Sequence, residues 1–513
     1  MNIDMTYRRL VSAAAVLSAL CALCSPSALG QRYERIVERN MWNTTSNVCG
    51  VRSDSVSVSQ AQIYGKYTGG DFRDLSDAPS LWSAGAFAET VSHFRRVSMI
   101  GKFSFDNEEA YNACGSMLSV RDAFPVDIYE FTPGRKTRQT YIVEGGIATE
   151  LSPSVLIGGK VDYLSSNRAK RKDLRSTVYL MDLKLTPSML IHFGRSSSIG
   201  LSYSYHRVSE SLSAEELGIS SESYYAFLDK GMMYGSYDVW TGGATHLNEA
   251  GVSGFPLRQN IHSLALQFAC GGFIAELSGT LGSGKAGEKD VRWFGFRNDG
   301  LSMFLGWKGG PHSARLKLSA DRKSSTEDII DRVTENGVTT TVNYGSRDIL
   351  SCTLWSASPE YRFLSDCLDL RAGLSFDYRA ETSTLVYPYL AKTLQYTAGA
   401  YVSGLYSLYG FDIGLGLSYR QGEWKDSLDY SAPSLGVSSA PKRLDELDVQ
   451  GRWYAAAKEY ETAGRLGVDL SLRYNFRFGL FLGASADYLH GFSLSVLPGA
   501  DRITAALNIG YAF

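Results

Sequence analysis

The chain has 513 residues, of which 20% are charged, and a formal net charge of −2 at pH 7. This balance leaves no basic surface for nucleic acid, so we expect no nucleic-acid partner. Glycine (51 residues) and tyrosine (31) are abundant while proline (13) is scarce, and the slightly negative mean hydropathy excludes a bundle of transmembrane helices.

The N-terminus has the layout of a secretory signal peptide. Arg8 and Arg9 precede an apolar stretch at residues 10–23, and residues 28–30 offer the small side chains that a signal peptidase reads. We therefore predict a signal peptide over residues 1–30. A buried N-terminal helix is the alternative.

Cysteine use indicates neither a disulfide framework nor a metal site. An odd number of cysteines remains after cleavage of the signal peptide, and they lack the spacing of metal ligands. We therefore expect no metal and no cofactor. A structural bridge between Cys352 and Cys367 across a hairpin is one open alternative. The five are Cys49, Cys114, Cys270, Cys352 and Cys367.

From residue 55 onward the chain alternates apolar residues with polar or small ones. Leu470 and Leu472, for example, flank Ser471 and follow Asp469. This period of two is typical of strands whose faces meet unlike environments. We predict about 18 strands, with 14 or 16 as alternatives: 55–67, 81–92, 95–106, 139–150, 154–166, 175–186, 189–207, 260–270, 273–283, 290–307, 312–322, 347–362, 367–380, 393–406, 410–421, 459–476, 478–490 and 502–513.

The connections between these strands alternate in length. Short turns, such as those predicted at residues 186–188 and 271–272, alternate with long polar segments at 107–138, 166–175, 208–259, 323–346 and 422–458. This layout is typical of a membrane barrel. We predict an all-β fold, a transmembrane antiparallel up-and-down β-barrel over residues 55–513 with short periplasmic turns and long extracellular loops. Residues 31–54 form a short periplasmic or lumenal segment ahead of it.

The charged side chains lie mid-strand on the non-apolar face. Each arginine or lysine facing lipid at the midplane would cost about 2–4 kcal/mol, and many such costs would exceed the total stability of an ordinary fold, about 5–15 kcal/mol. We therefore expect the apolar face to point outward and the charges to face the lumen. The candidates are Lys160, Asp162, Arg315, Lys317, Asp369, Arg371, Asp377, Arg379, Asp412, Arg420, Asp469 and Arg473.

The last strand ends on an aromatic residue with no polar tail: Leu507, Ile509, Tyr511 and Phe513 share one face. With the signal peptide and the alternating hairpins, this resembles outer-membrane β-barrel proteins of Gram-negative bacteria, and more narrowly barrel families of unknown function. The resemblance implies location in the cell outer membrane, contact with its lipid and lipopolysaccharide, and recognition of the last strand by the barrel-assembly machinery.

A barrel of this width predicts a channel or transporter for an unidentified small solute, since its interior leaves space unless something fills it. The alternative is a structural or surface-interaction barrel with a filled lumen. An energy-driven transporter with a folded plug domain is disfavoured, because only residues 31–54 precede the first strand.

The long segment 208–259 is rich in aromatic residues, which could stack on a ligand or fold back over the mouth as a gate. The candidates there are Tyr224, Tyr225, Phe227 and Trp240. We do not expect an enzyme. His206 shares a face with Ser202 and Ser204, but residues two apart in a strand are about 7 Å apart, and strand composition alone produces such sets often.

Overall fold

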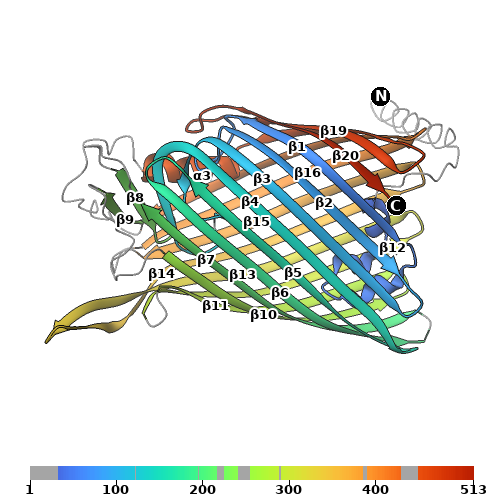
Figure 1. The fold of residues 1–513 in the computed structure, drawn as a ribbon, viewed down its shortest axis with the longest axis horizontal. Coiled ribbons are helices and arrows are strands. Elements are labelled where there is room, and N and C mark those ends of the chain that lie inside the picture. Colours follow the sequence, from blue (N-terminus) through green and yellow to red (C-terminus); the bar gives the residue numbers. More distant parts are fainter. Residues whose placement is uncertain are drawn as a thin grey trace, which may run out of the picture.

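The computed structural model describes residues 33–121, 123–194, 196–215, 224–240, 255–287, 291–384, 390–428 and 449–513. They form a closed antiparallel β-barrel (Figure 1) whose wall has 18 strands, which confirms the predicted fold class and strand number. The strands are β1 Val58–Gly70, β2 Ser80–His93, β3 Val97–Ser116, β4 Asp127–Ser152, β5 Val155–Lys170, β6 Arg175–Phe193, β7 Ser197–Glu215, β10 Phe255–Cys270, β11 Phe273–Gly287, β12 Arg292–Gly309, β13 His312–Glu335, β14 Val338–Leu364, β15 Leu368–Thr384, β16 Leu390–Leu408, β17 Phe411–Leu428, β18 Arg465–Asn475, β19 Leu480–Gly491 and β20 Asp501–Ala512.

Pairing of the first and last strands closes the barrel. The β1–β20 ladder runs from Gly70 opposite Arg502 to Gln60 opposite Ala512. Beyond it, Phe513 and Ser59 exchange two backbone hydrogen bonds of 2.9 Å. The last residue is therefore part of the wall, and closure leaves no free sheet edge, as a bilayer requires.

Exposure alternates along the wall strands as the sequence pattern predicts. On β20, Leu507 and the terminal Phe513 are 69% and 72% exposed, and on β18 Leu470 is 53% exposed. On the other face of β18, Arg473 is buried. Since the outward side chains are large and apolar, this face matches hydrocarbon and the charged face surrounds the lumen.

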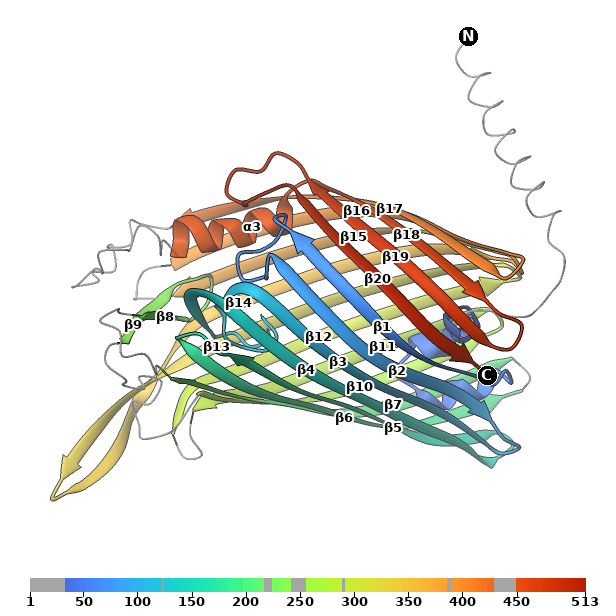
Figure 2. The same cartoon turned by 45° about the horizontal axis from the view of Figure 1, so that its top comes forward.

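The two ends of the barrel differ. At one, which we call the turn end, strands connect through short segments such as Gly271–Gly272; at the other, the loop end, the connections include every long segment. Strands extend into several predicted loops, and the β13–β14 hairpin runs far beyond the rim (Figures 1 and 2), turning at Asn336–Gly337. Both turn residues have positive φ, the geometry of a tight hairpin turn.

Seven elements of the described chain lie outside the wall. None of the helices that the structure describes is long and apolar enough to cross a membrane. Three are in the N-terminal segment and four at the loop end: α2 Tyr33–Val37, η1 Met41–Thr44, η2 Val48–Ser53, the hairpin strands β8 Tyr224–Asp229 and β9 Gly235–Trp240, η4 Val449–Tyr454 and α3 Ala455–Thr462.

Two predicted boundaries and one predicted contact are wrong. The turn at residues 186–188 does not exist, because β6 continues through Pro187 to Phe193. Proline has no N–H, so the β6–β7 ladder skips Thr186 and Pro187, and the Thr186 and Ser204 hydroxyls meet across the gap at 2.9 Å.

The strand predicted from residue 459 begins only at Arg465, because α3 occupies the preceding residues. Cys352 is a free thiol that lies opposite Glu381 in the β14–β15 ladder, so it does not bridge to Cys367.

Candidate functional site

Residues 33–54 lie inside the barrel at the turn end (Figure 2), and we call them the N-terminal plug. Two asparagines start its short helices: Asn40 Oδ1 accepts from Trp42 N (3.1 Å), and Asn47 Oδ1 accepts from Cys49 N (3.0 Å). Asn40 Nδ2 also donates to Gly50 O at 2.9 Å, which folds the plug back on itself. Gly50 is required there, since an added Cβ would lie 2.3 Å from Trp42 Cβ.

Apolar side chains of the plug pack on apolar patches of the inner wall. Met41 meets Ile274 and Phe304, while the buried Cys49 meets Leu156 and Leu190. Burial raises the pKa of the Cys49 thiol to about 12. These wall residues are apolar on the face that is otherwise polar. That departure from the alternating pattern is a sequence signal for a docked segment, and it did not enter the predictions made from the sequence.

A buried polar cluster fixes the centre of the plug. Ser46 N and Oγ both donate to Glu276 Oε2 at 2.8 Å. Gln267 Nε2 bonds the same carboxylate at 2.7 Å and Ser202 Oγ at 2.9 Å. Because each partner is a neutral donor around one carboxylate, the cluster is satisfied without a bound ion.

Ionic contacts hold the first part of the plug. Glu38 Oε2 lies 3.1 Å from Arg362 Nη1 and 2.7 Å from Arg371 Nη2, and Asp369 accepts from both arginines. Arg35 donates to Ser407 Oγ (3.1 Å) and to carbonyls in the β14–β15 turn. Burial lowers the pKa of Arg35.

The plug as a whole contacts strands most of the way around the wall. Near its end, Arg52 donates to Phe94 O at 3.0 Å in the β2–β3 turn and pairs with Glu150 of β4. Asn47 Nδ2 donates to Met189 O of β6 at 2.9 Å. Ser46 bonds β7 and β10 through Ser202 and Gln267, and the contacts described above add β11 and β16. The plug therefore spans the turn-end opening rather than lying along one side.

The loop end is covered by a second structure, which we call the cap: the described residues of segment 117–126, the β8–β9 hairpin and the η4–α3 helical segment. Met117, Leu118 and Phe124 are buried against the extended ends of wall strands. Arg121 pairs with Asp74 in the β1–β2 loop at 2.5 Å. Segment 117–126 thus folds inward instead of extending into solvent.

A buried ionic cluster anchors that inward fold. Glu130 is fully buried and pairs with Lys136 (3.0 Å) and Lys170 (2.5 Å). Lys136 also donates to Ser116 O at 3.4 Å, as does Arg168 at 3.1 Å. A buried carboxylate with two ammonium partners is costly to break. Arg168 also donates to Leu118 O, so this cluster of wall residues holds the start of segment 117–126.

The α3 helix bonds to the loop between β19 and β20. Glu459 accepts from Ser495 N, Ser495 Oγ, Val496 N and Leu497 N at 2.5–2.9 Å. Burial alone would raise the pKa of Glu459, but these hydrogen bonds outweigh it and lower the pKa. Tyr454 packs in a cluster with Phe227 and Met232 of the hairpin. Since Ala226 of the same hairpin shares a second buried cluster with Phe124, the hairpin packs against both other parts of the cap.

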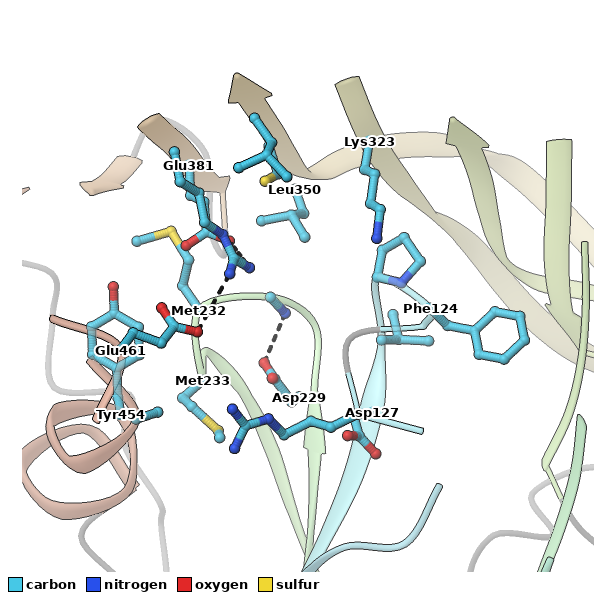
Figure 3. A pocket seen from close by; sticks show the side chains of 18 of the residues that line it. Phe124, Asp127, Asp229, Met232, Met233, Lys323, Leu350, Glu381, Tyr454 and Glu461 are labelled. Carbon is cyan, nitrogen blue, oxygen red and sulfur yellow. Dashed lines mark hydrogen bonds and ion pairs between the residues drawn. The ribbon is translucent and has the colours of Figure 1, made fainter. Parts of the chain in front are cut away.

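A cavity of about 360 Å³ lies between the cap and the wall. Figure 3 shows Asp229 and Met232 of the hairpin entering it from one side, Glu461 and Tyr454 of the helical segment from another, and Lys323 of β13 from the wall. Arg379 bonds Glu381 at 2.8 Å and lies 3.6 Å from Glu461 at its edge. Acidic, basic and apolar groups line it together, a set that suits a small polar solute better than a simple ion.

Most of the predicted lumen charges have ionic or hydrogen-bond partners on the same strand or on nearby strands. Lys160 pairs with Asp162 (2.6 Å) and Arg420 with Asp377 (3.4 Å). Others meet the plug or the cap, as described for Arg371 and Arg379. The remaining contacts are Arg315 with Glu360, Asp412 with Ser407 and Asn475, Asp469 opposite Asp487, and Arg473 over the Phe481 ring. Lys317 is exposed and lies opposite Ser358 in the β13–β14 ladder.

The aromatic candidates of segment 208–259 differ in their burial and in whether the structure describes their side chains. Phe227 is buried in the cap and Tyr225 is half-buried, so Phe227 is not available to an outside ligand here. The side chains of Tyr224 and Trp240 lie outside what the structure describes, as does the predicted signal peptide.

His206, Ser202 and Ser204 form hydrogen bonds or ion pairs with other residues of the protein. His206 Nε2 pairs with Asp182 at 2.7 Å. Ser204 bonds Thr186, and Ser202 bonds the plug through Ser46 at 2.6 Å. These serines have structural partners, and the expectation that the protein is not an enzyme stays a prediction.

The closed wall, the outward apolar face and the charged interior define a membrane-spanning β-barrel of the outer-membrane type, here with a plug and a cap. The chain belongs to the family described as a family of unknown function (DUF6850), whose model matches residues 49–513.

No curated protein matches the chain. Among solved structures, FpvA of P. aeruginosa in complex with heterologous pyoverdines is 7% identical over 89% of this chain and 71% of that chain, with a TM-score of 0.41. The outer membrane transporter YddB from Escherichia coli is 9% identical (88% and 81%, TM-score 0.40), and OmpT, an outer membrane protein of Vibrio cholerae, is 10% identical (80% and 98%, TM-score 0.33). Likenesses this weak say nothing about what this chain binds or transports.

Proposed function

We propose that this protein is a gated channel or transporter for a small polar solute in the outer membrane of a Gram-negative cell, with the N-terminal plug as its gate. In this proposal the turn end faces the periplasm and the loop end faces the outside, the arrangement that is general for such barrels.

One observation carries the proposal: the turn-end opening is closed by a short segment and not by the wall itself. Residues 33–54 continue directly into β1, and the contacts described above are non-covalent and largely polar. Water can replace such contacts one by one, so a segment of this kind can leave the opening without unfolding the barrel. The strand ladders are independent of it.

The cavity at the loop end supports the same proposal. A solute that enters under the cap meets paired acidic and basic groups, such as Arg379 with Glu381 and Lys458 with Glu381 (3.1 Å), beside Tyr454 and Leu350. Mixed charge favours polar or zwitterionic solutes over ions of one sign.

Current through planar bilayers tests the proposal. We would compare the refolded mature chain with a variant that lacks residues 33–50 and keeps β1 whole. We expect rare openings from the mature chain and sustained current from the variant. Absence of current from both proteins would contradict the proposal of a gated channel and support the alternative, a barrel with a filled lumen.

A further inference from the structure

A second, smaller cavity of about 90 Å³ lies at the turn end, between the plug and the turns that join β12 to β13 and β14 to β15. Five cationic side chains and two carboxylates line it. The cations are Arg35 and Arg39 of the plug with Lys308, Arg315 and Arg362 of the wall; the carboxylates are Glu38 and Asp366.

The carboxylates near this cavity are largely committed. Glu38 bridges Arg362 and Arg371, and Asp369 behind it bonds the same two arginines. Arg362, only 2% exposed, is therefore neutralised. The charge that remains around the cavity comes from the other cations.

Those cations are bonded mainly to neutral oxygens. Lys308 Nζ donates to Arg39 O at 2.8 Å, and Arg35 donates to two carbonyls and a hydroxyl. Arg315 donates to Glu38 O at 2.9 Å and lies 3.6 Å from Glu360. Among the described residues, Arg315 Nε is buried without a hydrogen-bond acceptor, while the buried Glu38 Oε2 and Glu360 Oε1 atoms nearby are held by ion pairs with arginines.

Cations that outnumber the carboxylates around a small space repel one another, and an oxyanion between them would satisfy their N–H groups. At about 10–15 Å³ for each water-sized atom, the cavity has room for the five heavy atoms of a phosphate. Phosphate also offers more acceptor oxygens and more charge than a single carboxylate.

We propose that this cavity binds a small oxyanion, a phosphate group, between the plug and the wall. The phosphate joins Arg35 and Arg39 to Lys308 and Arg315. The effect of this site on gating rests on the proposed function, in which bound phosphate stabilises the closed state. If the open state does not bind phosphate, a phosphate concentration of ten times the Kd lowers the open-to-closed ratio about elevenfold.

Titration calorimetry with inorganic phosphate tests the site. The protein is the full mature chain, refolded in maltoside micelles with chloride as the only other anion. The test variant carries Lys308→Gln and Arg39→Gln together. The matched control is Lys425→Gln, an exposed lysine that pairs with Glu423 on β17. Thermal unfolding of all three proteins shows whether each variant is folded.

We expect saturable binding by the unmodified protein and the control, and at least a tenfold weaker affinity in the double variant. Absence of saturable binding by the unmodified protein, or equal binding by the folded double variant, would overturn the site. Because calorimetry reads binding and not current, this result is independent of whether the barrel conducts.

A second arm separates the two sources of a phosphate group. The titration is repeated in phospholipid nanodiscs. If a lipid headgroup occupies the cavity, the binding seen in micelles disappears; if the natural ligand is free phosphate, the binding persists. Either outcome supports a phosphate site, and the micelle titration alone decides whether the site exists.

Discussion

Glu38 offers the sharpest perturbation of the plug. Its carboxylate joins the plug to two wall arginines, at 3.1 Å from Arg362 Nη1 and 2.7 Å from Arg371 Nη2. Glu38→Gln removes the charge and keeps the shape. Both arginines retain Asp369, so the substitution leaves no unpaired buried charge.

The magnitude follows from these two contacts. A hydrogen bond to a charged group contributes about 1.5–3 kcal/mol when buried, and exposed ion pairs only about 0.2–1 kcal/mol. The Glu38 side chain is 36% exposed, between these limits. We therefore expect the closed state to lose about 1–2 kcal/mol, which raises the open-to-closed ratio about 5–30-fold.

Single-channel recording in planar bilayers measures this ratio directly. Phosphate-free chloride buffer removes any contribution from the turn-end cavity. Asp366→Asn is the matched control: it neutralises a neighbouring exposed carboxylate whose bond to the plug uses only the backbone carbonyl, which the substitution keeps. If channels of the Glu38→Gln and Asp366→Asn variants open equally rarely, the ion pairs of Glu38 with Arg362 and Arg371 do not hold the plug in place.

Three further predictions concern the plug and the wall. Gly50→Ala places a Cβ 2.3 Å from Trp42 Cβ and should make residues 33–54 susceptible to limited proteolysis. Gly145→Ala is the control, because the space around its Cβ is open. Equal cleavage of residues 33–54 in the two variants would refute the close packing. Because burial raises its pKa to about 12, Cys49 stays a protonated thiol at pH 8 and should resist iodoacetamide while the exposed Cys270 reacts. Mass spectrometry reports both, and rapid labelling of Cys49 in the unmodified protein would contradict its burial between the plug and the wall. Leu470→Arg, which faces lipid, should cost about 2–4 kcal/mol in urea titrations of vesicle-inserted protein, and lumen-facing Ser471→Arg much less; the reverse order would contradict the assigned faces.

The wall could be predicted from the sequence because a barrel strand repeats one simple rule. Residues such as Leu470 and Leu507 meet lipid at every second position, so the period of two marks each strand without knowledge of its neighbours. The prediction of a turn at Pro187 was wrong, although proline usually indicates a turn. There the hydroxyls of Thr186 and Ser204 bridge the interrupted ladder, a contact that depends on a partner strand.

The plug and the cap could not be predicted because their stability comes from tertiary contacts. Met41 and Cys49 are buried only because Phe304, Leu156 and Leu190 face inward on distant strands. Helix α3 begins at Ala455 without a capping side chain and depends on packing and on the bonds of Glu459. Such contacts join residues far apart in sequence, so inward apolar residues such as Phe304 indicate that a segment docks there but do not give its conformation.

The direction of the two wall faces underlies all of these interpretations, and quenching by brominated lipid tests it most directly. A fluorophore is attached at single cysteines replacing Leu470 and Ile509, and in separate variants at Ser471 and Asn508, in a background lacking the exposed native cysteine. We predict strong quenching at 470 and 509 and little at 471 and 508. Equal quenching at all four positions, or stronger quenching at 471 and 508, would contradict a barrel whose apolar face meets lipid and whose charges surround a closed lumen.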